Sequence, residues 1–250
     1  DTKFEGTYGM PDVPCDPAQA NTMNGCDFMD ISLVDGWTLP FKLEIAGGPC
    51  IGSGSLEPVT HVDCSGLSLD RCPKDDNLGD GAVNMQAINP NTGKVAGCYG
   101  PCLKLIDPKW KNTIKEGLNR DHPAVAPYCC TTPPMTSETC NAGPIVGTKY
   151  VQSVHNFCPG VYAFAYDDGR GLLRCPSTTL YELTFFCPTG GPKQAETAAD
   201  RDFEESVPMQ PMATVAPAAL AAAAVPAAPP AVVPAVPAVK PAGFATKSCA

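Results

Sequence analysis

Fourteen cysteines in a chain of 250 residues constrain the fold of this protein more than any other feature. They lie between Cys15 and Cys249 without repeated C-x-x-C pairs, and the accompanying histidines are His61, His122 and His155. Structural zinc sites use closely spaced Cys and His ligands, so this pattern favours disulfides, and we expect no metal and no cofactor. Disulfides persist in oxidising compartments, which predicts a secreted, extracellular or cell-surface protein.

The overall composition excludes several other classes of protein. The chain has 28 prolines and 23 glycines and only 17% charged residues, which argues against a helical or α/β fold. Its formal net charge of −9 argues against binding to nucleic acid, because phosphates require Lys and Arg partners. The acidic segment Asp75–Gly81 lacks the spacing of an EF-hand loop and is better explained as a solvated turn.

The composition changes at about residue 190. The segment Ala213–Ala245 is almost entirely Ala, Pro and Val. Repeated prolines interrupt any long helix, so this segment predicts no membrane span but a semi-extended stalk or linker. We therefore expect a folded domain over residues 1–189 and a disordered Ala/Pro-rich tail over residues 190–250.

Short strand patterns and turn residues fill the first part of the chain. Residues 161–166 and 180–186 both have strand character, and the turn-forming residues 167–171 between them predict a C-terminal hairpin. Residues 28–45 predict two strands around the turn dipeptide Asp35-Gly36. Most of residues 50–140 predicts loops, with one helix over residues 107–119, where Pro108 suits the first turn and apolar residues recur every four positions.

Two segments carry a resemblance to a known family. Residues 157–168 are FCPGVYAFAYDD, followed by a C-P pair and by YELTFFCP at residues 181–188, and residues 27–40 are DFMDISLVDGWTLP. These segments, with the doublet Cys129-Cys130 and the pair Cys98 and Cys102, resemble the thaumatin-like proteins of the pathogenesis-related 5 type. The resemblance implies a disulfide-rich β-sandwich with a loop-rich, disulfide-stapled region and one short helix. It also implies that N-terminal strands of the domain precede residue 1.

Cysteine order gives an expected disulfide map. Cys15 and Cys26 flank an insertion and predict a local bridge. For the other pairs, the order of cysteines in the resembled family implies Cys50–Cys175, Cys64–Cys158, Cys72–Cys98, Cys102–Cys129 and Cys130–Cys140. Cys187 and Cys249 remain, and they either bridge to each other or link the chain to a separate polypeptide.

The resemblance also implies an acidic cleft. Its candidate residues are Glu5, Asp30, Asp35 and Asp167, and in the family such a cleft is associated with binding, and in some members slowly cleaving, β-1,3-glucans. Hydrolysis of a glycosidic bond needs one protonated carboxyl and one carboxylate. Aromatic faces suited to stacking on sugars are those of Trp37, Tyr162 and Tyr166.

Each acid also has an ordinary structural explanation. Asp30 could hydrogen-bond to the backbone or pair with Arg170, and both Asp35-Gly36 and Asp167-Asp168-Gly169 could be simple turns.

Two functional hypotheses follow from these features. The first is a carbohydrate-binding protein of defence or wall modification that recognises β-1,3-glucan or another cell-wall polysaccharide, at most a weak endo-β-1,3-glucanase. The second is a structural extracellular component that is joined to its neighbours through its tail and through Cys187 or Cys249.

Overall fold

The computed structural model describes residues 2–10, 12–19, 25–54, 57–108, 113–115 and 117–187. Strands outnumber helices among these residues, and their bounds are β1 (Lys3–Thr7), β2 (Cys26–Ser32), β3 (Gly36–Trp37), β4 (Phe41–Ala46), β5 (Cys50–Gly52), β6 (Pro58–Val59), β7 (His61–Cys64), β8 (Asp76–Asn77), β9 (Ala82–Val83), β10 (Gln86–Ile88), β11 (Val95–Tyr99), β12 (Leu173–Pro176) and β13 (Leu180–Phe185). The helical segments are η1 (Leu69–Arg71), α1 (Pro101–Ile106), α2 (Ala126–Cys129), α3 (Ser137–Asn141), η3 (Pro144–Gly147), α4 (Lys149–Phe157) and α5 (Asp168–Gly171).

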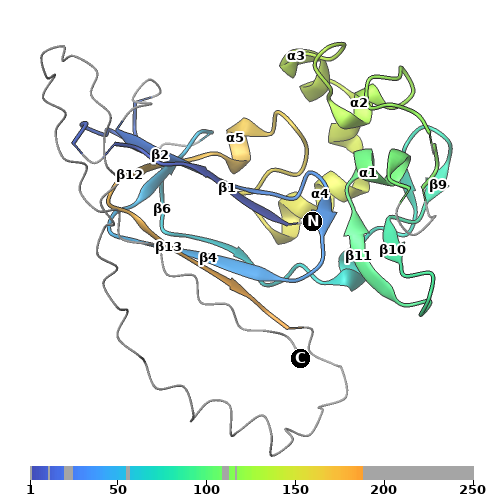
Figure 1. Ribbon diagram of the computed structural model, residues 1–250, viewed down its shortest axis with the longest axis horizontal. Coiled ribbons are helices and arrows are strands. Elements are labelled where there is room, and N and C mark those ends of the chain that lie inside the picture. Colours follow the sequence, from blue (N-terminus) through green and yellow to red (C-terminus); the bar gives the residue numbers. More distant parts are fainter. Residues whose placement is uncertain are drawn as a thin grey trace, which may run out of the picture. The chain divides into compact units, whose positions relative to one another are not determined.

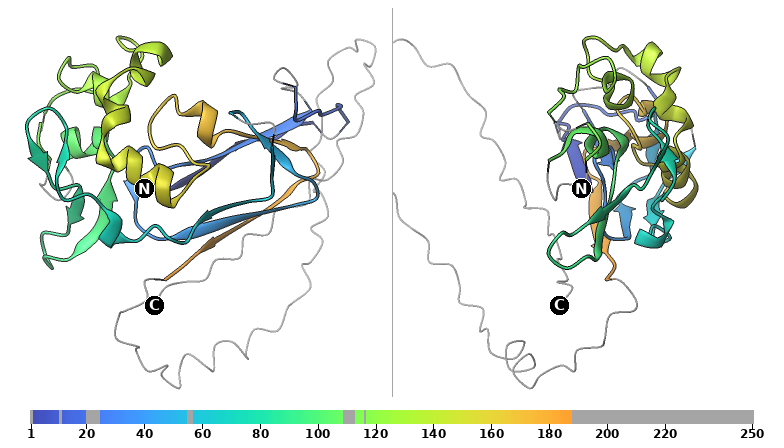
Figure 2. Two further views of the ribbon diagram at one scale, coloured as in Figure 1. Left: turned by 180° about the vertical axis from the view of Figure 1, so that it is seen from behind. Right: turned by 90° about the vertical axis from the view of Figure 1, so that its right-hand side faces the viewer.

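Two sheets lie face to face and form a sandwich (Figures 1 and 2). One has five strands in the order β1-β2-β12-β5-β6, and the other has three in the order β13-β4-β7. Alternate residues of a strand point to opposite faces, which directs Met29 and Ile31 of one sheet and Phe41 and Leu43 of the other into a common core. The predicted disulfide-rich all-β class is therefore confirmed.

A loop-rich region lies along the chain mainly between the sandwich strands β7 and β12. It holds the short sheet β10-β11-β3, the pair β8-β9 and the helices α1 to α4. The N-terminus of α4 is capped twice: the Thr148 hydroxyl accepts from the Val151 amide, and the buried Asp76 carboxylate accepts from the amides of Lys149 and Tyr150, both at 2.9 Å. Asp76 thereby satisfies amides that a helix start leaves without intrahelical partners. The expectation of a solvated turn at residues 75–81 is therefore wrong for Asp76, which is buried and has this structural role.

Six disulfides connect these parts, and they are the six pairs predicted from the sequence. Cys50–Cys175 joins β5 to β12 within the five-stranded sheet. Cys64–Cys158 joins β7 of the sheet β13-β4-β7 to the end of α4. Cys72–Cys98, Cys102–Cys129 and Cys130–Cys140 each join two parts of the loop-rich region. Cys187 is also disulfide-bonded, whereas Cys249 and the predicted tail lie outside the described residues.

The predicted C-terminal hairpin is wrong. Residues 180–185 form a strand, but this strand, β13, pairs with β4, and residues 161–166 contribute one bridge, from Tyr162 to Ser32. Tyr166 has a positive φ of 70°, which ends any extended run. The segment between them contains the short helix α5 and the strand β12, which pairs with β2 and β5 of the other sheet. Similarly, both strands predicted in residues 28–45 form, but β2 and β4 belong to different sheets.

The predicted helix over residues 107–119 is also wrong in the part of it that the structure describes. Asp107 ends α1 in an extended conformation, and residues 113–115 and 117–119 are turn or coil. The cause is Pro108, because a proline disfavours helical backbone in the residue before it. The expectation of a single short helix is corrected as well, since five α-helices occur among the described residues. None of these helices is long and apolar enough to cross a membrane.

Candidate acidic site

The candidate site begins with two carboxylates on neighbouring strands. In the antiparallel pair of β1 and β2, Glu5 lies directly opposite Asp30. Their neighbours in the register, Phe4 opposite Ile31, pack toward the core, so the two acids share the other face of the sheet. Side chains of directly opposite residues are close neighbours on such a face. The strand register therefore brings these two acids together.

A third carboxylate reaches this face from α5. The Tyr162 hydroxyl donates a hydrogen bond to Asp168 Oδ1 at 2.7 Å. Tyr162 is itself fixed to the end of β2, because its amide donates to the Ile31 carbonyl at 2.9 Å and its carbonyl accepts from the Leu33 amide at 2.8 Å. We call Glu5, Asp30 and Asp168 the acidic cluster.

The electrostatics show that Asp30 is the centre of this cluster. Burial, followed by the charges of Glu5 and Asp168, raises the pKa of Asp30 to about 6. Burial and the hydrogen bond to Asp168 also raise the pKa of the Tyr162 hydroxyl, so this hydroxyl stays a donor at any physiological pH. A carboxyl that titrates near pH 6 beside other carboxylates is typical of catalytic and binding sites.

Asp167, predicted as a cleft residue, does not belong to this cluster. It is buried, with 6% of its surface exposed, and its Oδ2 accepts from the Ala163 amide at 3.0 Å and lies 2.7 Å from His155 Nε2. Asp167 therefore holds the loop before α5 in place. The second aspartate of the doublet, Asp168, is the exposed one that joins Asp30.

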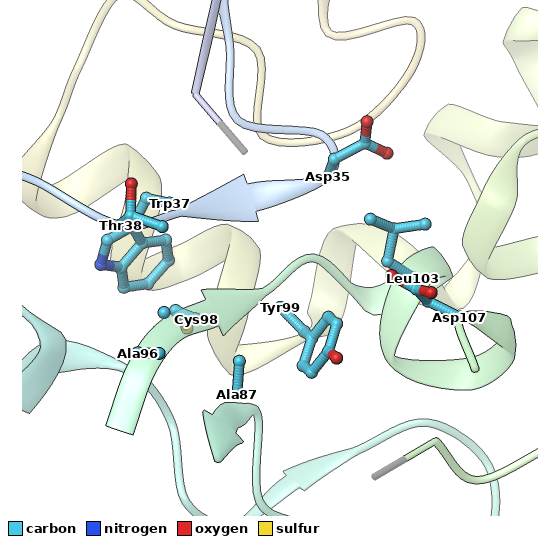
Figure 3. Close-up of a pocket in the computed structure, with 10 residues that line it drawn as sticks. Asp35, Trp37, Thr38, Ala87, Ala96, Cys98, Tyr99, Leu103 and Asp107 are labelled. Atoms are coloured by element: carbon cyan, nitrogen blue, oxygen red, sulfur yellow. The ribbon is translucent and has the colours of Figure 1, made fainter. Parts of the chain in front are cut away.

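Asp35 is predicted as a cleft residue too, but it is engaged elsewhere. Its Oδ2 forms an ion pair with Lys3 Nζ, and its Oδ1 lies 4.0 Å from Arg120 Nη2. Asp35 borders a separate hollow of about 160 Å³. Figure 3 shows the Asp35 carboxylate directed away from the rings of Trp37 and Tyr99 that line this hollow.

Of the three aromatic residues predicted to stack on a sugar, Trp37 is excluded. Only 1% of its surface is exposed, because its ring stacks on Tyr150 at a centroid distance of 5.2 Å inside the core. Tyr166 is partly exposed, and its hydroxyl bonds to Thr132. Tyr162 is partly exposed beside the acidic cluster. The alternative pairing of Asp30 with Arg170 is not formed between these two described residues.

The fold agrees with the comparisons to known proteins. A sequence model described as "Thaumatin family" matches residues 8–188. The chain belongs to the thaumatin family. It is 33% identical over 171 residues to a protein named glucan endo-1,3-beta-glucosidase from Prunus avium, which covers 66% of this chain and 50% of that protein.

Two further relatives are named as thaumatin-like proteins. Thaumatin-like protein 2 from Prunus persica is 30% identical over 185 residues, covering 73% of this chain and 59% of its own length. Thaumatin-like protein 1 from Pyrus pyrifolia is 30% identical over 201 residues, covering 73% of this chain and 63% of its own length. This chain thus spans between half and two thirds of the length of these relatives.

The sequence did not predict that Asp168 is a candidate site residue or that His155 is the partner of Asp167. The doublet Asp167-Asp168 contains no signal that tells which carboxylate is buried, since either could face the core. His155 lies on the amphipathic helix α4, after Tyr150 and Val151. The N-cap residue Thr148 is the sequence signal from which the start of this helix could have been predicted. No group of three or more His, Cys, Asp or Glu side chains among the described residues is arranged to hold a metal ion.

Proposed function

We propose that this protein is a secreted carbohydrate-binding member of the thaumatin family that recognises β-1,3-glucan at the acidic cluster. The observation that carries the proposal is the position of Glu5 directly opposite Asp30, where burial and the charges of Glu5 and Asp168 raise the pKa of Asp30 to about 6. The printed name of the Prunus avium relative, a glucan endo-1,3-beta-glucosidase, supports the choice of sugar. A role in defence or in cell-wall modification fits such a ligand.

The cluster has the chemistry to bind sugar hydroxyls. Ionised carboxylates accept hydrogen bonds from hydroxyl groups, and such charge-assisted bonds are stronger than neutral ones. The Tyr162 ring adds an apolar face with a polar tip, which suits the mixed surface of a pyranose. Because Asp168 is exposed and Asp30 is partly exposed, a ligand can reach both carboxyl groups.

Weak hydrolysis is the activity that this arrangement can support. Near pH 6 about half of the Asp30 side chains carry a proton, so Asp30 is the candidate acid that protonates the leaving oxygen. Glu5 or Asp168 is then the carboxylate that stabilises the developing positive charge or activates water. Asp35 and Asp167 have no part in this step, since Lys3 and His155 occupy their carboxylates.

Calorimetric titration with a soluble β-1,3-glucan hexasaccharide tests the proposal. We expect saturable binding by the wild-type protein, and binding at least about 10-fold weaker in Asp168→Asn and Asp30→Asn, because each change removes a charge-assisted hydrogen bond. Asp121→Asn, an exposed acid outside the cluster, is the matched control and retains binding. A wild-type protein that takes up no hexasaccharide at millimolar concentration overturns the proposal.

The second hypothesis, a structural extracellular component, depends on the tail and on the link through Cys187 or Cys249. Cys187 is disulfide-bonded, whereas Cys249 and the tail lie outside the described residues, so this hypothesis stays a prediction.

A further inference from the structure

We infer that a bound glucan chain runs past Asp168 into a second subsite, a polar hollow between α5 and α3. The inference rests on the proposed function and deepens it, because it sets the length of chain that the protein prefers. The hollow has a volume of about 680 Å³. Asp168 lines it and also belongs to the acidic cluster, so one ligand can touch both.

The hollow has walls from three distant parts of the chain. Gly54 and Gly169 form one side, and α3 supplies Ser137 and Asn141 on the other. The two glycines are in close contact, since a Cβ on Gly54 would lie 1.7 Å from the Gly169 carbonyl oxygen. Asp167 also lines the hollow, and its carboxylate is held by His155 and by the Ala163 amide. Figures 1 and 2 show α3 and α5 on the same side of the sandwich.

The lining has the polar chemistry of a sugar site. Arg170 is exposed, and it makes no ion pair with any residue that the structure describes, so its guanidinium is free to donate to hydroxyl oxygens. The Asn141 amide nitrogen donates to the carbonyls of Ser137 and Tyr166, at 2.9 and 3.3 Å, which fixes the orientation of this side chain across the hollow.

Electrostatics favour a neutral sugar chain over a polyanion in this subsite. Asp167 and Asp168 line the hollow beside a single guanidinium, and Glu5 and Asp30 lie next to it in the acidic cluster. Uronic acid or sulfate groups would meet this excess of carboxylates and be repelled. A neutral β-glucan offers hydroxyls that both donate to Asp168 and accept from Arg170.

The consequence is a dependence on chain length. A disaccharide can occupy the acidic cluster alone, whereas a hexasaccharide can fill both subsites. Calorimetric titrations of both β-1,3-glucose oligosaccharides into wild type, Arg170→Ala and Asn141→Ala test this. We expect the variants to bind the hexasaccharide roughly 5- to 10-fold more weakly than wild type, as for the loss of a hydrogen bond to a charged or polar group, and the disaccharide within 2-fold of wild type.

The matched control is Lys94→Ala, which removes one exposed positive charge far along the chain and retains binding of both sugars. Equal hexasaccharide affinity in wild type, Arg170→Ala and Asn141→Ala overturns the second subsite but leaves the acidic cluster intact. Absence of binding of either sugar by wild type overturns the proposed function as well. Weaker binding of both sugars by the two variants places these residues at the acidic cluster and also contradicts the second subsite.

Discussion

Glu5 lies directly across the β1–β2 pair from Asp30, so two acids face each other on one side of the large sheet. Like charges directly opposite each other destabilise a sheet, and here the exposed Asp168 adds a third charge. Burial, followed by these two charges, raises the pKa of Asp30. Structure and proposed function are thus connected through the protonation of one side chain.

The first prediction concerns stability against pH. The pKa of Asp30 is about 6 in the folded protein and near 4 when unfolded, so between these values the folded state binds more protons. The titration of Asp30 therefore lowers the free energy of unfolding as pH rises from about 4 through 6. We expect Asp30→Asn to increase the free energy of unfolding by roughly 1–2 kcal/mol at pH 8, allowing for partial exposure, and by much less at pH 4.

Urea unfolding at the two pH values, with Asp121→Asn as the control, measures this difference. If Asp30→Asn increases the free energy of unfolding equally at pH 4 and pH 8, the increase does not come from the titration of Asp30.

The second prediction separates the two members of the aspartate doublet. Asp167→Ala leaves the Ala163 amide and His155 without their buried partner and is expected to lower the free energy of unfolding by about 2–4 kcal/mol. Asp168→Ala removes an exposed group and is expected to change stability by less than about 0.5 kcal/mol while weakening sugar binding at least about 10-fold. Denaturant unfolding measures stability, and calorimetry measures sugar binding, on both variants. A loss of stability in Asp168→Ala together with a loss of binding by a stable Asp167→Ala would contradict the proposed site.

The third prediction concerns the start of α4. Asp76→Ala removes the acceptor of two amides at the N-terminus of this helix, which is expected to cost about 2–3 kcal/mol of stability. Its neighbour Asp75 is the matched control, because it makes an exposed ion pair with Lys149, and Asp75→Ala is expected to cost less than about 0.5 kcal/mol. Similar unfolding midpoints for the two variants contradict the capping role.

The fourth prediction compares two disulfides. In the chain-entropy model, Cys64–Cys158 with a separation of 94 residues contributes up to about 4–5 kcal/mol, and Cys15–Cys26 with a separation of 11 residues about 3 kcal/mol. Overlap with Cys50–Cys175 reduces the first figure, but Cys64 and Cys158 are also fully buried and link a sheet to α4. We therefore expect paired alanine substitution at Cys64 and Cys158 to destabilise more, as measured by unfolding without reductant. A larger loss from the Cys15 and Cys26 pair would contradict this ranking.

The disulfide map, the all-β class and the family could be predicted from the sequence, because the order of cysteines and two long motifs carry that information. The helix over residues 107–119 could not be excluded by periodicity. The Pro108 that suits a first helical turn also ends α1 at Asp107, and a pattern of apolar residues does not reveal which effect prevails.

The site was predicted in part for a similar reason. Glu5 and Asp30 were among the candidates, and the strand register brings these two side chains together. The choice between Asp167 and Asp168 depends on His155, which is 12 residues away in sequence and reaches the doublet only through the packing of α4. The burial of Trp37 likewise depends on Tyr150, which a local pattern does not contain. The domain boundary at residue 189 and the nature of the tail remain predictions.

The most direct test of the acidic cluster is an NMR titration of the Asp30 carboxyl carbon. The structure predicts a midpoint near pH 6, which moves toward the ordinary value near 4 in Glu5→Gln and in Asp168→Asn, since each variant removes one of the charges that raise it. A midpoint near 4 in the wild-type protein, or one that neither variant shifts, would contradict the convergence of these three side chains and with it the proposed function.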